Sequence, residues 1–283
     1  MQKLNHESTI TLKNGVVLPV VGFGTYKLKG EVCEDSVQSA LTSGYRHIDT
    51  AMIYKNEAEV GKVVNNFGLL REEVFITSKL WNLDQGYDTT LRAIDESLVR
   101  LGTSYVDLYL VHWPTASADE TITINKRQET WRAMEEIYKS GKARAIGVSN
   151  FTVNHLKEME AYANVLPMVN QVEFHPFLYQ KELLEYCRLH DIVVEAYSPL
   201  TQGNKLTDER IMTIAKKHLR EPSQILLRWS LQHGLVPLPR SSNKQHIIQN
   251  IQIFDFELDM EDMDKLDSLN ENLHFLRDPG ILG

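Results

Sequence analysis

Four titratable side chains of different types lie at or just after the ends of three successive apolar runs. Asp49 ends the first run and Tyr54 follows it, Lys79 lies at the end of the second, and His112 ends the third. Packing alone seldom places a carboxylate, a phenol, an ammonium and an imidazole at neighbouring run ends. We therefore expect these groups to converge on one chemically active site.

Each of the four has an ordinary structural interpretation when it is taken alone. Asp49 could neighbour a helix N-cap, and Tyr54 could be an aromatic on a rim. Lys79 could be a solvated charge and His112 a core histidine with satisfied hydrogen bonds. It is their combination that favours a shared site.

Alternating strands and helices would position these residues. Runs rich in β-branched and aromatic residues predict eight strands, at residues 20–23, 45–49, 74–80, 105–112, 143–149, 168–173, 192–197 and 235–238. Apolar residues at three- and four-residue spacing predict helices between them, including residues 57–67, 89–101, 126–140, 153–163 and 180–190. Such strands run parallel, joined by right-handed crossovers, and their continuous apolar character indicates burial on both faces.

A single (β/α)8 TIM barrel of the α/β class, spanning residues 1–283, fits this alternation better than two open-sheet halves. The length suits one such barrel, and no Pro/Gly/Ser-rich linker divides the chain. Near the start, "STITLKNGVVLPVVGFGT" has two β-type runs around Asn14 and Gly15, which predict an N-terminal β-hairpin cap. The active sites of such barrels lie at the carboxyl ends of the strands, and the four titratable residues are at those ends.

Composition restricts the classes of function. The formal net charge of −8 argues against a general nucleic-acid binder. The only cysteines, Cys33 and Cys187, are outside any C-x-x-C or zinc-type spacing, which supports neither a disulfide framework nor a metal site and favours a reducing cytosol. No apolar run reaches signal-peptide or membrane-spanning character. We expect a cytoplasmic protein without metal, nucleic-acid or membrane partners.

The motifs around the four residues resemble those of the aldo-keto reductase family. They are D-T-A-x-x-Y at residues 49–54, Lys79 in "TSKLW", "LVHWP" at 110–114 and "GVSNF" at 147–151, and the similarity runs from the hairpin to "FDFEL" at 254–258. The resemblance implies an enzyme that reduces aldehydes and ketones with hydride from a nicotinamide. Within the family, the sequence is similar to the microbial and protozoan branch. That branch includes aldehyde, methylglyoxal and diketogluconate reductases and prostaglandin F synthases. The sequence does not choose among these substrates.

The resemblance also implies catalytic roles. Tyr54 would be the general acid, although a phenol with an ordinary pKa near ~10 donates reluctantly unless its phenolate is stabilised. Lys79 would supply that stabilisation, and Asp49 would keep Lys79 charged and oriented. His112 would steer the carbonyl by hydrogen bonding.

A nicotinamide cofactor would have to lie across the barrel mouth, because the chain has no G-x-G-x-x-G motif for a Rossmann site. By resemblance the cofactor is NADPH, with NADH as an alternative. Side chains of Ser149, Asn150 and Gln171 would bond its carboxamide, and Tyr197 would stack on its ring. Alternatively, these strand-end residues could simply close turns and contact no cofactor. The full expected cofactor set is Gly24, Thr25, Asp49, Ser149, Asn150, Gln171, Tyr197, Ser198, Leu200, Arg240, Ser241, Ser242, His246, Gln249 and Asn250.

The phosphate end of this set departs from the family at two positions. The loops "SPLTQGNKL" and "PRSSNKQHIIQN" follow the last two strands, where barrels commonly bind phosphate, and the second opens a helix whose amides suit an anion. Arg240 stands where the family usually has a lysine for the 2′-phosphate. His246 replaces the arginine of members that strongly prefer NADPH, and neutral imidazole is the weaker clamp.

Aromatic residues around Tyr54 and His112 would line the substrate pocket. Tyr26, Trp81 and Trp113 are the candidates, with rim packing as the structural alternative. Such walls favour an apolar or planar carbonyl compound. The short segment after His112 and the short tail "NENLHFLRDPGILG" predict an open, permissive pocket.

Three other functions fit parts of the sequence. A nicotinamide-sensing accessory subunit with slow turnover would need an interaction surface, which the sequence does not indicate. A metal-dependent hydrolase would need more His or carboxylate ligands at the strand ends. A structural role like that of lens crystallins is a third alternative, because such proteins can keep the fold of an enzyme. By resemblance, the protein is expected to be a monomer.

Overall fold

The computed structural model describes residues 4–115 and 120–281, and its centre is an eight-stranded parallel sheet. The strands are β3 (Phe23–Gly24), β4 (His47–Asp49), β5 (Phe75–Leu80), β6 (Val106–Val111), β7 (Ala143–Ser149), β8 (Val169–Glu173), β9 (Val193–Tyr197) and β10 (Val236–Pro237). They follow one another in sequence order around the sheet. Gly22 N donates to Pro237 O (3.1 Å) and Gly24 N to Pro239 O (3.0 Å), so the first strand returns to the last. The predicted (β/α)8 barrel is confirmed.

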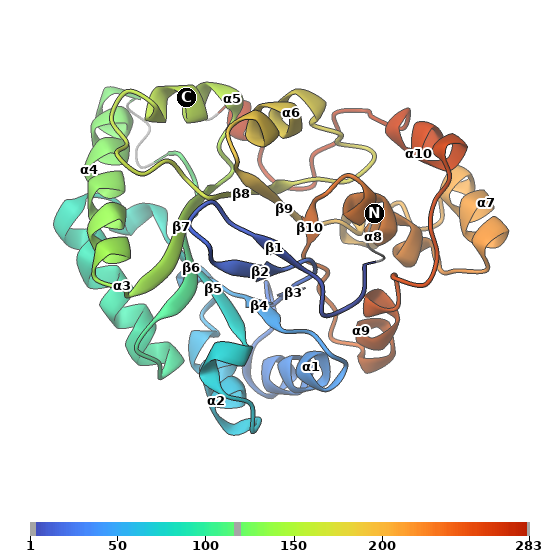
Figure 1. Cartoon of the computed structure of the whole chain (residues 1–283), viewed down its shortest axis with the longest axis horizontal. Helices are drawn as coiled ribbons and strands as arrows, with labels where there is room; N and C mark the ends of the chain where they lie inside the picture. Colours follow the sequence, from blue (N-terminus) through green and yellow to red (C-terminus); the bar gives the residue numbers. More distant parts are fainter. Residues whose placement is uncertain (1–3, 116–119, 282–283) are drawn as a thin grey trace.

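Helices surround this barrel (Figure 1). They are α1 (Gly30–Thr42), α2 (Glu57–Asn66), α3 (Tyr87–Leu101), α4 (Glu120–Lys139), α5 (Val153–Met159), α6 (Lys181–Leu189), α7 (Glu209–His218), α8 (Pro222–Gln232), α9 (Lys244–Ile251) and α10 (Met260–Asp267). Helix α4 begins before the predicted residue 126. Helix α8 is buried from Gln224 to Leu231, so it lacks the one-sided apolar stripe by which a surface helix is recognised in a sequence.

The predicted hairpin is present and covers one end of the barrel, where Figure 1 shows it crossing in front of the strands. β1 (Thr9–Thr11) pairs antiparallel with β2 (Val17–Pro19). In the turn Gly15 adopts φ +87°, which a residue without a side chain tolerates, and Asn14 Oδ1 accepts from Val16 N at 3.1 Å. Leu18 is fully buried among apolar residues of the barrel interior.

Gly22 makes the barrel closure sterically feasible. A Cβ at this position would lie 2.5 Å from the Leu238 side chain and 2.6 Å from His47 Nδ1, closer than real contacts allow. Apolar residues, Leu18 among them, fill the part of the barrel interior that the hairpin covers. Within the described residues, no helix is long and apolar enough to cross a membrane.

Candidate active site

A buried ion pair joins the ends of β4 and β5. Lys79 Nζ lies 2.7 Å from both Asp49 Oδ1 and Asp49 Oδ2, and it also donates to Thr50 O at 2.9 Å. The Lys79 side chain is completely buried. An ammonium in such a place must be paired, and these three acceptors satisfy its three N–H groups.

Tyr54 is brought to the same ammonium by a short 3-10 turn over Met52–Tyr54. The turn ends at Lys55, whose φ of +56° redirects the chain into α2. The Tyr54 hydroxyl lies 3.5 Å from Lys79 Nζ, and the ammonium stands 5.0 Å from the centre of the Tyr54 ring. Asp49, Lys79 and Tyr54 therefore form one contiguous cluster.

Asn56, which the sequence reasoning missed, fixes this turn. It is fully buried, its Oδ1 accepts from Thr50 Oγ1 at 2.7 Å, and its Nδ2 donates to Thr25 O and Leu28 O at 2.9 Å each. The loop that carries Tyr54 is thus tied to the loop after β3. An asparagine just before a helix start reads as an ordinary cap, but here its side chain makes no cap bond.

The surroundings of Tyr54 keep its phenol protonated. Burial, followed by the negative charge of Asp49, raises the pKa of the Tyr54 phenol well above its usual value. Both oxygens of Asp49 contact the Lys79 ammonium, which lies 3.5 Å from the Tyr54 hydroxyl. Tyr54 therefore holds its proton in the free protein.

His112 faces the cluster from the end of β6 and is neutral. Its ring packs edge-on against Tyr54 (centroids 5.7 Å apart) and Trp81 (5.4 Å). Burial and the nearby Lys79 charge lower the pKa of His112 well below its usual value. Within the described residues its Nδ1 is buried without a hydrogen-bond partner.

A second group of polar residues follows β7, β8 and β9. Asn150 adopts φ +65°, a left-handed conformation that asparagine tolerates, and its Nδ2 donates to His112 O (2.9 Å) and Ser149 Oγ (3.1 Å). Tyr197 OH donates to Asn150 Oδ1 at 2.7 Å, and Ser149 Oγ donates to Gln171 O at 2.8 Å. The N–H and O–H groups of Ser149 and Asn150 are thus committed within the protein. A ligand carbonyl that bonds there must displace one of these contacts.

Gln171 reaches inward from β8. Its Nε2 donates to Asp49 Oδ2 at 2.8 Å and to Glu195 Oε2 at 2.7 Å. Glu195, on β9, is fully buried, and burial followed by the charge of Asp49 raises its pKa to about 8. His47 Nε2 bonds Thr77 Oγ1 at 2.9 Å and lies 3.9 Å from Glu195 Oε1. Sequence reasoning missed Glu195 and His47, whose only signal is a polar residue inside an apolar run.

The other expected cofactor residues near β3 and β9 are largely engaged in structure. Thr25 N and Oγ1 both donate to Asp49 O, at 3.0 and 2.9 Å, and Gly24 lies in the barrel closure. Ser198 adopts φ +49°, and Leu200 is the N-cap residue of the short 3-10 turn Thr201–Gly203.

At the phosphate end, Arg240 is exposed and its Nε donates to Tyr26 O at 3.0 Å. Asn243 caps α9 by accepting from Gln245 N (2.8 Å) and His246 N (3.2 Å), and its own N–H donates to Ser241 Oγ at 3.0 Å. The cap leaves fewer free amides for an anion than the sequence suggested. Of the remaining expected residues, the structure exposes Ser242 and His246, half-buries Gln249 and buries Asn250.

The expected substrate walls surround Tyr54 and His112 in part. Tyr26 is exposed, and its ring centre lies 5.0 Å from that of Tyr54. Trp81 packs on His112 as described. Trp113 is half-buried, and its carbonyl accepts from Gln85 Nε2 at 2.8 Å. Part of the segment expected to be short after His112, residues 116–119, lies outside the described residues.

The carboxy-terminal tail is attached to the barrel at Glu173, the last residue of β8. Glu173 Oε1 accepts from Phe275 N (3.0 Å) and Oε2 from Leu276 N (3.1 Å). The Glu173 carboxylate is almost fully buried. The pKa of the neighbouring Tyr197 is raised first by the burial of its own hydroxyl and then by the charge of Glu173. The short tail thus reaches the same end of the barrel as the site.

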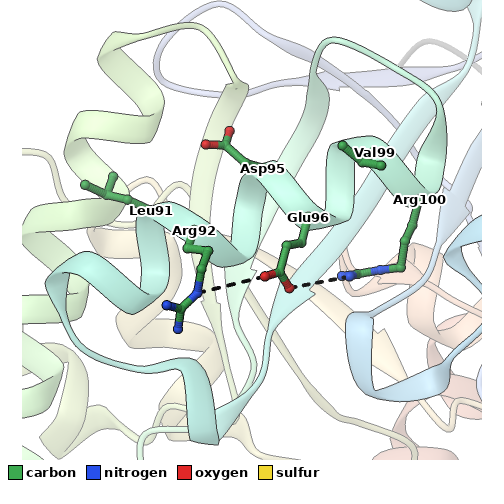
Figure 2. A pocket seen from close by; sticks show the side chains of 6 residues that line it. All are labelled: Leu91, Arg92, Asp95, Glu96, Val99 and Arg100. Carbon is green, nitrogen blue, oxygen red and sulfur yellow. Dashed lines mark ion pairs between the residues drawn. The ribbon is translucent and has the colours of Figure 1, made fainter.

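An open hollow of about 530 Å³ on the outer face of α3 is unrelated to this chemistry. Figure 2 shows its lining, in which Glu96 pairs with Arg92 (3.9 Å) and Arg100 (3.7 Å). Its charged residues neutralise one another, and none comes from a strand end. Across residues 4–115 and 120–281, no group of three or more His, Cys, Asp or Glu side chains could hold a metal ion.

Comparison with known proteins shows the family of this chain. A model of the aldo/keto reductase family matches residues 20–271. The chain belongs to the aldo/keto reductase family. It is 52% identical to a glyoxal reductase of Bacillus subtilis over 94% of both chains.

Solved structures of other aldo-keto reductases superpose closely on this one. An aldo-keto reductase from a Medee basin deep-sea metagenome library has a TM-score of 0.90 at 43% identity, covering 95% of this chain and 97% of the other. The aldo-keto reductase of Bombyx mori in complex with NADP has a TM-score of 0.88 at 34% identity, covering 97% and 96%. Membership of an oxidoreductase family agrees with the resemblance found in the motifs.

Proposed function

We propose that this aldo-keto reductase reduces aldehydes and ketones to alcohols with NADPH, and that Tyr54 is the general acid. The observation that carries the proposal is the shared ammonium: Lys79 Nζ contacts both oxygens of Asp49 at 2.7 Å and the Tyr54 hydroxyl at 3.5 Å. The arrangement lies at the carboxyl ends of the strands, where barrel enzymes act.

Bound NADPH would supply the hydride. The protein must then protonate the carbonyl oxygen, and Tyr54 holds its proton until that moment because the pKa of its phenol is raised. As the proton leaves, the developing phenolate gains a full charge beside Lys79. Stabilisation that appears only as charge develops lowers the barrier rather than strengthening ground-state binding.

His112 would orient the substrate as a neutral imidazole. Its lowered pKa keeps it uncharged, so it can hydrogen-bond a carbonyl without competing with Lys79 for the phenolate. Tyr26, Tyr54, Trp81, His112 and Trp113 would form the pocket walls. An apolar or planar carbonyl compound fits such walls.

The residues expected to hold the nucleotide fit it in part. Gln171 keeps one acceptor, Oε1, that neither Asp49 nor Glu195 occupies, and Tyr197 presents a ring beside Asn150. Arg240 is exposed near the start of α9, where a phosphate could reach it. We propose a preference for NADPH over NADH, weakened by the absence of an arginine at His246.

For the substrate we propose small dicarbonyl aldehydes such as glyoxal and methylglyoxal first. The support is the identity to a glyoxal reductase; keto sugar acids and prostaglandin endoperoxides are the alternatives. We further propose that residues 1–283 form one domain, because β3 to β10 make up a single sheet. We also propose that the protein acts as a monomer in the cytoplasm.

The test is the loss of reduced-nicotinamide absorbance with a panel of aldehydes, ketones and keto acids, with NADPH and NADH compared. The proposal predicts turnover of aldehydes, faster with NADPH, that survives a chelator. Nucleotide binding without turnover across the panel would contradict it and favour a nicotinamide-sensing subunit. Loss of activity with the chelator would favour a metal enzyme.

A further inference from the structure

Glu195 lies in the barrel interior and is not among the side chains assigned above to acid catalysis. It is fully buried on β9, beside Gln171 on the neighbouring strand β8. Its Oε2 accepts from Gln171 Nε2 at 2.7 Å, and its Oε1 has no hydrogen-bond partner among the described residues. A buried carboxyl group is costly on a strand where an apolar residue would pack. This cost calls for a function.

The amide of Gln171 is held in one orientation by two carboxyl groups. An amide NH₂ has two hydrogens, and here one points to Asp49 Oδ2 (2.8 Å) and the other to Glu195 Oε2 (2.7 Å). The reverse orientation would place the amide oxygen beside Asp49 Oδ2 and Glu195 Oε2, the two oxygens that accept from the amide. Neither Asp49 nor Glu195 contacts the Gln171 oxygen, Oε1.

We propose that Glu195 is a positioning residue that fixes the Gln171 amide, so that the site offers an oxygen acceptor and selects a ligand that carries an N–H donor. On the proposed nucleotide binding, on which this inference rests, that donor is the carboxamide NH₂ of the nicotinamide. Asp49 alone cannot do this as well, because it accepts only one of the two hydrogens and is also the partner of Lys79.

The test compares two nucleotides that differ in this donor, without any turnover. NADP⁺ carries the carboxamide, and the 3-acetylpyridine analogue of NADP⁺ replaces its NH₂ with a methyl group. Dissociation constants for both are measured by calorimetry on the wild type, Glu195→Met and Glu195→Gln. Met removes the acceptor at similar size, whereas Gln keeps an oxygen that can accept from Gln171.

We expect the wild type to bind NADP⁺ more tightly than the analogue. In Glu195→Met the preference should fall about five- to tenfold, the worth of roughly one hydrogen bond, through weaker NADP⁺ binding. Glu195→Gln should restore it. If Glu195→Met does not fold, Glu195→Thr, a residue suited to strands but too short to reach Gln171, takes its place.

Three outcomes would overturn the inference. Equal weakening of both nucleotides in Glu195→Met would show a merely structural role. Loss of the preference in Glu195→Gln would show that an oxygen acceptor at this position is not enough to fix the Gln171 amide. If the wild type binds NADP⁺ and the analogue equally well, the contact to the carboxamide N–H donor is excluded and the proposed function stands. If the wild type binds neither nucleotide, the proposed function is overturned as well.

Discussion

Lys79 Nζ lies 2.7 Å from each of the two carboxylate oxygens of Asp49, and the lysine side chain is completely buried in the barrel. Such a pair is not a strong source of stability, because desolvation offsets most of the attraction. Breaking it is a different matter, since the remaining partner is a buried, unpaired charge. The pair therefore serves to hold an ammonium under Tyr54.

A double-mutant cycle measures this coupling. Lys79→Met should lower the free energy of unfolding by about 3–5 kcal/mol, because it leaves Asp49 buried and unpaired. Asp49→Asn together with Lys79→Met should recover part of that loss in urea unfolding. Lys62→Met is the control: it breaks an equally short pair with Glu34 on the surface and should change little. Additive losses from the two buried substitutions would contradict the coupling.

The raised pKa of Glu195, about 8, predicts that stability falls as pH rises. Above ~4.5 the carboxyl is ionised in the unfolded chain, while the folded protein keeps the proton up to about pH 8, so the folded state binds more protons in this window. Glu195→Gln removes this dependence. The stability of the variant relative to wild type should therefore rise from pH 4.5 to 8, by at most about 1.4 kcal/mol per pH unit, and then level off.

Chemical denaturation across this pH range is the measurement. Glu72→Gln makes the same change at an exposed position and serves as the matched control. A difference between wild type and Glu195→Gln that stays constant from pH 4.5 to 8 would show that Glu195 ionises normally in the folded protein.

Buried neutral histidines predict the opposite slope in acid. Burial lowers the pKa of His47 to about 3 and that of His155 to about 4, with the Lys79 and Arg127 charges as the second causes. Below pH ~6.5, the histidine pKa in the unfolded chain, these residues are protonated when the chain is unfolded but stay neutral when it is folded. The free energy of unfolding therefore falls as pH drops from 6.5 toward 4. The Glu195→Gln background isolates this effect. Proton uptake on unfolding at pH 5 measures it; no uptake would contradict the neutral histidines.

Arg240 and His246 should set the choice between nucleotides. Arg240→Met is expected to weaken NADPH binding about 10- to 100-fold and NADH binding little, since it removes a charge-assisted contact to the 2′-phosphate. His246→Arg should strengthen NADPH binding alone. Fluorescence titration of both nucleotides tests this, with Lys244→Met as the control for loss of an exposed cation on α9. Equal loss of NADPH affinity in Lys244→Met and Arg240→Met would point to general charge attraction.

Glu173 should control the tail. Glu173→Ala removes the carboxylate that accepts from Phe275 N and Leu276 N, so the tail should detach more often and trypsin should cleave after Arg277 faster. Mass spectrometry of a digestion time course gives the rate. Glu271→Ala removes a nearby acidic residue that pairs with Lys205 and is the control. Identical cleavage rates in the wild type and Glu173→Ala would show that the carboxylate does not retain the tail.

The sequence was informative where function follows from position along one strand. Asp49, Lys79 and His112 end successive strands, and the geometry of any parallel barrel brings such ends together. It was silent where side chains meet across the barrel interior. Glu195 and Gln171 share a register that depends on strand stagger. The pKa of Tyr54 depends first on how deeply the phenol is buried and then on the nearby charge of Asp49. Neither can be derived from spacing alone.

The central claim is that Tyr54 delivers the proton, and the most direct test is Tyr54→Phe. The ring and its packing against Tyr26 and His112 are kept, and only the hydroxyl is lost. We predict that turnover of aldehydes falls by at least about 10²-fold, while the dissociation constant for NADPH stays within about twofold of wild type. Carbonyl reduction by Tyr54→Phe at a rate comparable to wild type would contradict the account.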